Sequence, residues 1–274
     1  MTQPMMTFND GHTMPQLGAG IWQVPKDQTA RVVREALEIG YRLIDGAKAY
    51  GNEEGLGQGL RDSGIPRDEV FVTTKLWNDA QGRDATLKAF DASMTRLGLD
   101  RLDLYLIHWP VPKADLYVET WKTLIELRDQ GRIRSIGVAN FNEDHLQRLV
   151  DETGVTPALN QIEIHPTLIQ SDMRAVNERM GIVTQSWTPL GRGDFEAPEI
   201  RSIAETHDRT PAQVVLRWHI QHGLSVIPKS EKRERLAENF AALDFELSQA
   251  DMDAIDALDQ NQRTGPDPQT FDMR

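Results

Sequence analysis

Short apolar runs rich in valine, isoleucine and leucine recur along the whole chain. Continuous runs of this kind are typical of parallel strands that are buried on both faces of a sheet. They predict eight strands, near residues 17–22, 42–45, 70–75, 102–108, 133–139, 158–163, 182–187 and 225–228.

The segments between these runs carry apolar residues at helical spacing, as in Val32, Val33, Ala36 and Leu37. Glycine follows the predicted helices with unusual regularity, and glycine just past a helix end adopts the left-handed turn without a side-chain clash. The glycines concerned are Gly40, Gly98, Gly131, Gly154, Gly181 and Gly223. These segments are therefore predicted to be helices that end at glycine.

Strand and helix thus alternate about eight times, which predicts a parallel sheet with crossover helices. Eight units in roughly 250 residues is the size of a (β/α)₈ TIM barrel. We predict extra helices after strand seven and at the C-terminus. Residues 5–14 are predicted to form a hairpin that closes the barrel floor, with its turn at residues 9–11. The whole chain, 1–274, is predicted to be one domain.

An open doubly wound sheet is the main alternative fold, and it would carry a Gly-x-Gly-x-x-Gly motif after its first strand. The nearest candidate is Gly55, Gly57 and Gly59, which has the wrong spacing and lies inside a predicted helix. A helix that packs closely on its neighbour explains these glycines better, so the barrel is preferred.

Charge and composition narrow the possible functions. The net charge of −12 over 274 residues disfavours a general nucleic-acid binder, which needs basic surface. The chain has no cysteine, which excludes disulfides and thiolate catalysis and fits a reducing cytosol. No apolar run is long enough to span a bilayer, and the first residues lack a secretion signal. We expect a cytoplasmic protein with no membrane partner.

Three polar residues are expected at the ends of successive strands: Asp45, Lys75 and His108. Tyr50 lies in the loop after the first of these strands. Because the active site of such a barrel lies at the carboxyl ends of its strands, these side chains should converge. A lysine ammonium beside a tyrosine lowers the pKa of the phenol, and an aspartate would keep the lysine charged. Together with a histidine that orients the substrate oxygen, they would form a proton donor.

Each residue also has a simpler explanation. An aspartate at a strand end is usually a helix cap, and a lone histidine more often packs than reacts. His219 and His222 lie three residues apart on a helix, but no third ligand is found near them, so no metal site is predicted. The convergence of several residues on one rim is what favours catalysis.

Four segments resemble motifs of the aldo-keto reductase family. They are residues 40–45 with 50–53, residues 104–110, residues 133–140, and residues 227–230 with Arg235, Glu238 and Asn239. Residues 74–78, 160–163 and 217–219 are similar to the bacterial 2,5-diketo-D-gluconate reductase group, as is the short C-terminal tail. The resemblance covers nearly the whole chain in the same order.

The resemblance implies a catalytic tetrad of Asp45, Tyr50, Lys75 and His108, with NADPH as the hydride donor. Trp187 would stack on the nicotinamide, while Asn140 and Gln161 would hold its carboxamide. Lys229, Ser230 and Arg235 would hold the adenosine 2′-phosphate, with Lys232 as a further phosphate contact, since cations at a helix start suit a phosphate. Glu238 and Asn239 would hold the adenine, and Leu190 is implied as a further cofactor contact.

The chain departs from the family pattern at four positions. Ala139 replaces a serine, so one carboxamide hydrogen bond is lost, worth about 0.5–1.5 kcal/mol. Leu43 and Gly46 replace histidine and threonine beside the aspartate. Glu231 lies in the phosphate loop and would repel a 2′-phosphate, which weakens the preference for NADPH over NADH.

The substrate is expected to be a small carbonyl compound, such as 2,5-diketo-D-gluconate or a 2-oxo aldehyde. Trp22, Trp77, Trp109 and His108 are predicted to line its pocket together with Trp187. A monomer is expected. Two other classes remain open, a cofactor-binding regulatory subunit with negligible turnover and an aldolase that uses Lys75 as a Schiff-base nucleophile, although a charged lysine is in the wrong state for the latter.

Overall fold

A computed structural model of the chain describes residues 3–191 and 193–273. Within them, one sheet contains eight parallel strands that follow one another in chain order. The strands are β3 (Ala19–Gly20), β4 (Leu43–Asp45), β5 (Phe71–Leu76), β6 (Leu102–Ile107), β7 (Ile133–Ala139), β8 (Leu159–Glu163), β9 (Val183–Trp187) and β10 (Ser225–Val226). The predicted parallel sheet is confirmed. Helices cover the outer face of its strands, and buried side chains such as Leu43, Leu104 and Leu106 pack together on the other face.

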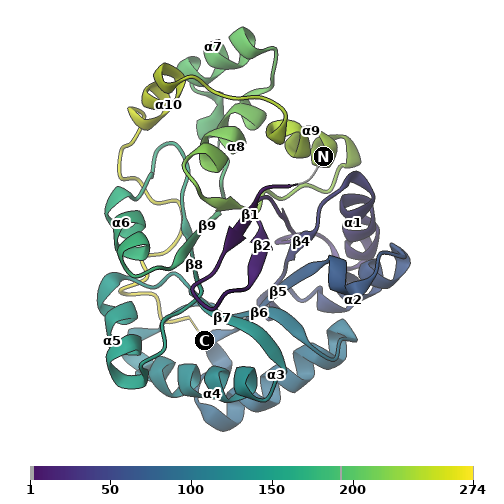
Figure 1. Ribbon diagram of the computed structural model, residues 1–274, viewed down its shortest axis with the longest axis vertical. Coiled ribbons are helices and arrows are strands. Elements are labelled where there is room, and N and C mark those ends of the chain that lie inside the picture. The colour runs from purple at the N-terminus through teal and green to yellow at the C-terminus, as the bar shows by residue number, and fades with distance from the viewer. Residues whose placement is uncertain (1–2, 192, 274) are drawn as a thin grey trace.

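The first and last strands also meet, so the sheet closes on itself. Parallel bridges join Leu17 to Val226 and Gly20 to Lys229. The backbone N–H of Gly18 donates to the carbonyl of Val226 at 2.8 Å. The strands form a central ring with the helices around it (Figure 1). The (β/α)₈ prediction is therefore confirmed, and the open doubly wound alternative is wrong.

Ten α-helices lie in the described residues. They are α1 (Lys26–Ile39), α2 (Glu53–Asp62), α3 (Arg83–Leu97), α4 (Tyr117–Asp129), α5 (Glu143–Thr153), α6 (Ser171–Arg179), α7 (Pro198–His207), α8 (Pro211–Gln221), α9 (Arg233–Phe240) and α10 (Gln249–Asp256). Both predicted additions are present, since α7 is the extra helix after β9 and α10 lies near the C-terminus. At Gly98 the backbone turns left-handed and its N–H bonds the carbonyl of Met94 at 2.8 Å, as expected of a glycine that ends a helix.

An N-terminal hairpin covers the opposite end of the ring from the site described below. Its antiparallel strands are β1 (Met5–Thr7) and β2 (Thr13–Pro15), and they lie across the barrel in Figure 1. Phe8 packs against Phe71 at the start of β5, and the Asn9 side chain donates to the carbonyl of Pro157 before β8. These contacts confirm the predicted floor, because they are made at the amino ends of the barrel strands.

The glycine triplet of α2 serves packing. A Cβ added at Gly57 would lie 1.9 Å from the carbonyl oxygen of Leu97, and one at Gly59 would lie 2.6 Å from that of Ala30. Only glycine allows α2 to approach α1 and the end of α3 this closely. None of the described helices combines the length and apolar character that a bilayer crossing requires.

Candidate active site

The structure brings the four predicted catalytic residues together at the carboxyl end of the barrel. Asp45 is the last residue of β4, and Lys75 lies near the end of β5. His108 directly follows β6, while Tyr50 ends a short 3₁₀ helix, η1 (Lys48–Tyr50), in the loop after β4. Neighbouring parallel strands end at the same rim, so residues far apart in sequence meet there.

Lys75 is the centre of the cluster, and its side chain is fully buried. Its ammonium donates to Asp45 Oδ2 at 2.6 Å and to the carbonyl of Gly46 at 2.8 Å. The third contact joins Lys75 Nζ to the Tyr50 hydroxyl at 3.4 Å. Burial lowers the pKa of Lys75, but Asp45 and Tyr50 together raise it above its usual value. The lysine is therefore a charged ammonium at neutral pH.

The pKa of Tyr50 is raised, whereas from the sequence we expected Lys75 to lower it. Burial raises the pKa of the phenol, and Lys75 lowers it by less, so the net direction is upward. Asp45 adds to the rise, because a nearby negative charge disfavours the phenolate. The lysine lowers the pKa as expected, but desolvation is the larger effect. Tyr50 is thus a neutral phenol at neutral pH, which is the state a proton donor requires.

His108 lies close to Tyr50, although their strands β6 and β4 are separated by β5 in the sheet. The centroids of these two rings are 6.0 Å apart, and the ring centroid of Trp77 lies 5.1 Å from that of His108. Burial and then the charge of Lys75 hold the pKa of His108 well below its usual range. The imidazole is therefore neutral, and among the described residues its Nδ1 has no hydrogen-bond partner. A neutral imidazole can donate one hydrogen bond to a substrate oxygen.

Gln161 is bound to the tetrad. Its side-chain amide nitrogen donates to Asp45 Oδ1 at 3.0 Å and to Gln185 Oε1 at 2.6 Å. Gln185 in turn donates to the hydroxyl of Ser225 at 2.9 Å. The amide nitrogen of Gln161 is thus engaged by Asp45 and Gln185, so the carbonyl oxygen is the end of this predicted carboxamide contact that remains for a ligand.

Asn140 and Trp187 form a fixed pair at the rim. Trp187 Nε1 donates to Asn140 Oδ1 at 2.8 Å, and Asn140 Nδ2 donates to the carbonyl of His108 at 3.0 Å. Asn140 has a left-handed backbone with φ of 64°, a conformation that asparagine tolerates better than most residues. The pair links the aromatic ring at the end of β9 to the backbone of the tetrad.

The predicted phosphate cluster lies where β10 leads into α9. Lys232 and Arg235 are exposed, and neither makes an ion pair within the part of the chain that the structure describes. Ser230 is buried, and its hydroxyl accepts the backbone N–H of Lys232 at 3.1 Å. Lys229 pairs with Glu231 at 2.5 Å. Glu231 thus neutralises one of the lysines expected to hold a phosphate.

The remaining predicted cofactor residues have partners of their own. Glu238 accepts a hydrogen bond from the hydroxyl of Thr210 at 2.7 Å. Asn239 is buried on α9, and Leu190 is partly buried against the hydrophobic core. The tryptophans differ in their surroundings. Trp22 is 47% exposed, whereas Trp109 is buried and packs on Phe271 with centroids 4.4 Å apart.

The departures from the family pattern have local consequences. A Cβ at Gly46 would lie 2.9 Å from Leu56 Cδ1, so a larger residue there requires Leu56 to move. Leu43 and Ala139 are wholly buried in the barrel. Gly46 supplies a carbonyl to Lys75, and this contact does not depend on its side chain.

Two features escaped the sequence analysis. The first is the carboxylate of Glu53, which is buried at the start of α2 and accepts from Thr74, Ser93 and Arg96. It fixes the helix that follows Tyr50, and the available signal in the sequence was an acidic residue three positions after the tyrosine. The second is the C-terminal tail, which reaches Asn78 through the carbonyl of Met273 at 2.7 Å. Its sequence has no pattern that predicts where it lies.

The two histidines of α8 have structural partners. His219 is fully buried, and its Nε2 lies 3.0 Å from the carbonyl oxygen of Pro189. His222 Nε2 lies 2.9 Å from Asp256 Oδ1. His219 therefore supports the loop that follows β9.

Comparisons with known proteins agree with this geometry. The model of the Aldo/keto reductase family matches residues 5–260. An aldo-keto reductase of Mycolicibacterium smegmatis is 56% identical over 98% of both chains. The methylglyoxal reductase DkgA of Escherichia coli is 50% identical over 97% of this chain and 98% of its own.

Solved structures show the same similarity. A crystal structure of a Gox0644 mutant in complex with NADPH is 52% identical, with a TM-score of 0.95 over 99% of both chains. An aldo-keto reductase of Bombyx mori in complex with NADP is 35% identical, with a TM-score of 0.90. The closed parallel barrel, the residues gathered at its carboxyl rim and a family match over most of the sequence lead to one conclusion: this chain belongs to the aldo-keto reductase family.

Proposed function

We propose that this protein is an NADPH-dependent reductase of small aldehydes and ketones in which Tyr50 donates the proton. The observation that carries the proposal is the buried ammonium of Lys75, which contacts both the Asp45 carboxylate and the Tyr50 hydroxyl. The relatives add support, since one similar enzyme is named a methylglyoxal reductase and one similar structure contains NADPH.

The residues around the rim fit a nicotinamide dinucleotide. Lys232 and Arg235 provide exposed positive charge without an ion-pair partner among the described residues, beside a helix start where a phosphate is stabilised. Trp187 is partly exposed, and its indole N–H is tied to Asn140, so the ring is oriented for stacking. When bound, the cofactor supplies the hydride.

The protein's own part in the reaction is to hold the carbonyl and move one proton. The substrate oxygen would lie between the Tyr50 hydroxyl and the His108 ring, where two neutral donors can orient it. As negative charge develops on this oxygen, the nearby ammonium of Lys75 stabilises it.

Proton transfer is favourable despite the raised pKa of Tyr50. An alkoxide is far more basic than a phenolate, so the proton moves from Tyr50 to the nascent alcohol. The phenolate that forms lies 3.4 Å from Lys75 Nζ, and this charge stabilises it until solvent returns a proton. Asp45 keeps the lysine charged throughout.

The substrate class follows from the relatives and the predicted aromatic pocket. We propose 2-oxo aldehydes such as methylglyoxal and sugar-derived diketones such as 2,5-diketo-D-gluconate. The proposal includes a monomer in the cytoplasm, which size-exclusion chromatography and fractionation would test. Lys75 is less suited to a Schiff base, because its amine is charged and fully enclosed by acceptors. Borohydride trapping of substrate on Lys75 would instead show that Lys75 forms a Schiff base.

The test is an NADPH-oxidation screen over a panel of carbonyl compounds, with NADH in parallel. For an accepted substrate, Tyr50→Phe should lower kcat by at least about two orders of magnitude, the usual contribution of acid–base catalysis. The dissociation constant of NADPH should stay nearly unchanged. Normal turnover of several carbonyls by the variant would remove Tyr50 from the proposed role.

A further inference from the structure

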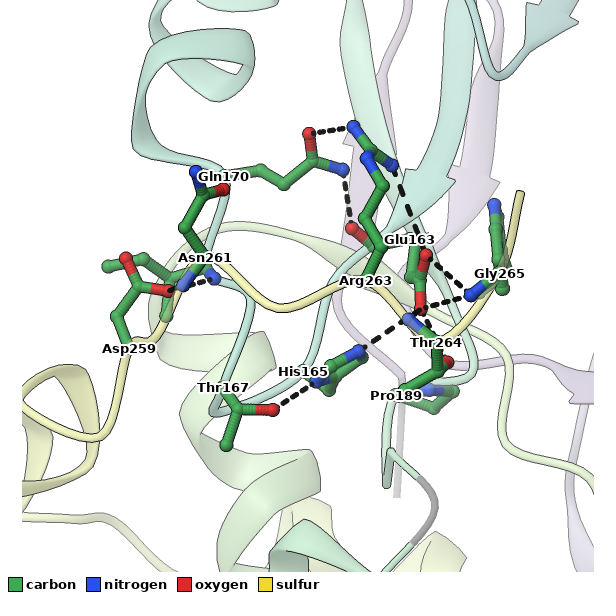
Figure 2. Close-up of polar contacts among 12 residues, drawn as sticks. Glu163, His165, Thr167, Gln170, Pro189, Asp259, Asn261, Arg263, Thr264 and Gly265 are labelled. Atoms are coloured by element: carbon green, nitrogen blue, oxygen red, sulfur yellow. Dashed lines mark hydrogen bonds and ion pairs between the residues drawn. The ribbon is translucent and has the colours of Figure 1, made fainter. Parts of the chain in front are cut away.

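The C-terminal tail is fastened to the barrel rim by one acidic side chain. After α10, residues 259–273 run along the carboxyl side of the barrel past β8 and β9 (Figure 1). Figure 2 shows the tail at Glu163, the last residue of β8, with donors around its carboxylate.

The carboxylate of Glu163 is completely buried, yet its donors come mostly from the tail. Its Oε1 accepts the backbone N–H of Thr264 at 2.7 Å and the Thr264 hydroxyl at 2.5 Å. The N–H of Gly265 lies 3.1 Å from Oε1 and 3.2 Å from Oε2. Charge-assisted hydrogen bonds in a dry site are the strong ones. Glu163 is therefore the main anchor of these two tail residues.

A second set of contacts holds the tail just before this point. The carbonyl of Thr167 accepts the backbone N–H groups of Gln260 and Gln262, both at 3.1 Å. Arg263 donates to the Gln170 side chain at 3.1 Å, and that side chain donates to the Glu163 carbonyl at 2.6 Å (Figure 2). The tail thus reaches Glu163 in a fixed register.

The anchored segment lies against Trp187. A Cβ added at Gly265 would be 2.4 Å from Cη2 of the Trp187 ring and 3.2 Å from Glu163 Oε2. Trp187 is in turn hydrogen-bonded to Asn140, and Asn140 to the carbonyl of His108. One side of the indole therefore lies against the tail backbone, and its N–H is linked through Asn140 to the backbone carbonyl of His108.

We propose that Glu163 is a positioning residue, which by holding Thr264 and Gly265 against Trp187 sets the orientation of the indole ring on which the cofactor binds. This inference rests on the proposed function for its effect on NADPH, but not for the anchoring itself. The direct consequence is that the tail is a part of the binding site rather than a loose end.

The charge of Glu163 is central to this role. Burial raises the pKa of the carboxyl, but hydrogen bonds from His165, Thr264 and Gly265 outweigh this, and the pKa lies below its usual value. The group is thus a carboxylate at neutral pH. Gln at this position would have nearly the same shape but would present an NH₂ group to N–H and O–H donors.

The anchoring is tested by amide hydrogen exchange on the chain without cofactor. In Glu163→Gln, the amides of Thr264 and Gly265 should lose protection by about tenfold or more, because a hydrogen bond to a charged group typically contributes that much. Amides within β8 should keep theirs, which separates tail release from unfolding. Thr264→Val removes only the hydroxyl donor in the tail and should weaken protection in the same direction, whereas Thr264→Ser should not.

The effect on the site is tested by NADPH titration. Glu163→Gln and Gly265→Ala should each raise the dissociation constant of NADPH by about tenfold. Gly265→Ala leaves Glu163 intact but pushes the tail away from the indole, so it probes the contact with Trp187 directly. Thr95→Val removes an exposed threonine hydroxyl bonded within α3, and this matched control should bind NADPH as the original chain does.

Two results would overturn the inference. One is unchanged protection of Thr264 and Gly265 in Glu163→Gln. The other is a tail that is released in this variant while NADPH affinity stays at the original value. If the unsubstituted protein binds no NADPH, the proposed function is wrong. The exchange experiment would still decide whether Glu163 anchors the tail.

Discussion

Gln161 donates its side-chain amide to Asp45 from the far side of the barrel, at 3.0 Å. Each oxygen of the Asp45 carboxylate therefore accepts from a different donor: Oδ1 from Gln161 and Oδ2 from Lys75 at 2.6 Å. This arrangement fixes the carboxylate plane and with it the direction of the lysine. A buried ion pair with satisfied hydrogen bonds specifies geometry more than it adds stability.

Replacing Asp45 with asparagine should leave Lys75 without its countercharge and lower the activity. With its countercharge gone, burial would lower the pKa of Lys75, and the variant should lose about two orders of magnitude in kcat. Stability to urea should fall by about 3–5 kcal/mol, because an unpaired charge remains buried. The double variant Asp45→Asn with Lys75→Met should regain part of that loss in the same assay. A single variant as stable as the original chain would contradict the described ion pair.

Replacing Arg235 with alanine should affect NADPH far more than NADH. If its guanidinium holds the 2′-phosphate, the KM for NADPH should rise about tenfold or more, since a charge-assisted bond is lost. Steady-state kinetics with both cofactors measure the ratio, and Arg179→Ala, at an exposed position on α6, serves as the matched control. Equal changes for the two cofactors would remove Arg235 from the phosphate site.

Glu231→Gln, in the same phosphate loop, should strengthen NADPH binding, whereas Arg235→Ala should weaken it. The structure pairs Glu231 with Lys229, so removing the carboxylate frees a lysine and removes a repulsion. The KM for NADPH should fall by a few-fold, since exposed charge pairs contribute about 1 kcal/mol or less. A weaker affinity for NADPH in this variant would mean that Glu231 positions the loop instead.

Gly57→Ala should destabilise the protein although alanine is the better helix former. Helix propensity alone predicts that the free energy of unfolding rises by about 1 kcal/mol. The new Cβ would meet the carbonyl oxygen of Leu97 at 1.9 Å, and overpacking of this kind costs about 1–3 kcal/mol. Thermal unfolding measures the change, and a higher Tm would show that α2 can move away from α3 at little cost.

Acid should destabilise the protein through His219. Burial lowers the pKa of His219 to about 3, so the folded state keeps it neutral while the unfolded state protonates it below about 6.5. The unfolded state then binds more protons, and stability falls as the pH drops from about 6.5 towards 3, by about 1.4 kcal/mol per pH unit. Denaturant titrations at several pH values should give a shallower slope for His219→Gln. An identical slope would mean that other groups cause the acid loss.

Much of the barrel could be predicted locally. Apolar runs such as that ending at Ile107 are typical of strands buried on both faces, and a glycine such as Gly98 can end a helix because its backbone adopts the left-handed turn. The hairpin floor and the helix inserted before β10 were also predicted, because spacing and turn residues are local signals.

The site could be predicted only in part, because its energetics depend on surroundings that sequence does not specify. Asp45, Lys75 and His108 were found at strand ends, and the barrel topology brings such ends together. The net pKa direction of Tyr50 was missed, since it depends on how completely neighbouring side chains exclude water.

The sequence by itself determined the alternation of strand and helix, the closed parallel barrel and the residues at its rim, because periodicity and turn chemistry act over a few residues. Only the tertiary structure decided that Glu163 meets Thr264, some hundred residues later in the chain, and that Gly265 lies on Trp187. Neither the sequence around Glu163 nor that of the tail contains a local pattern that predicts their contact. Their contact arises from the path of the chain around the barrel.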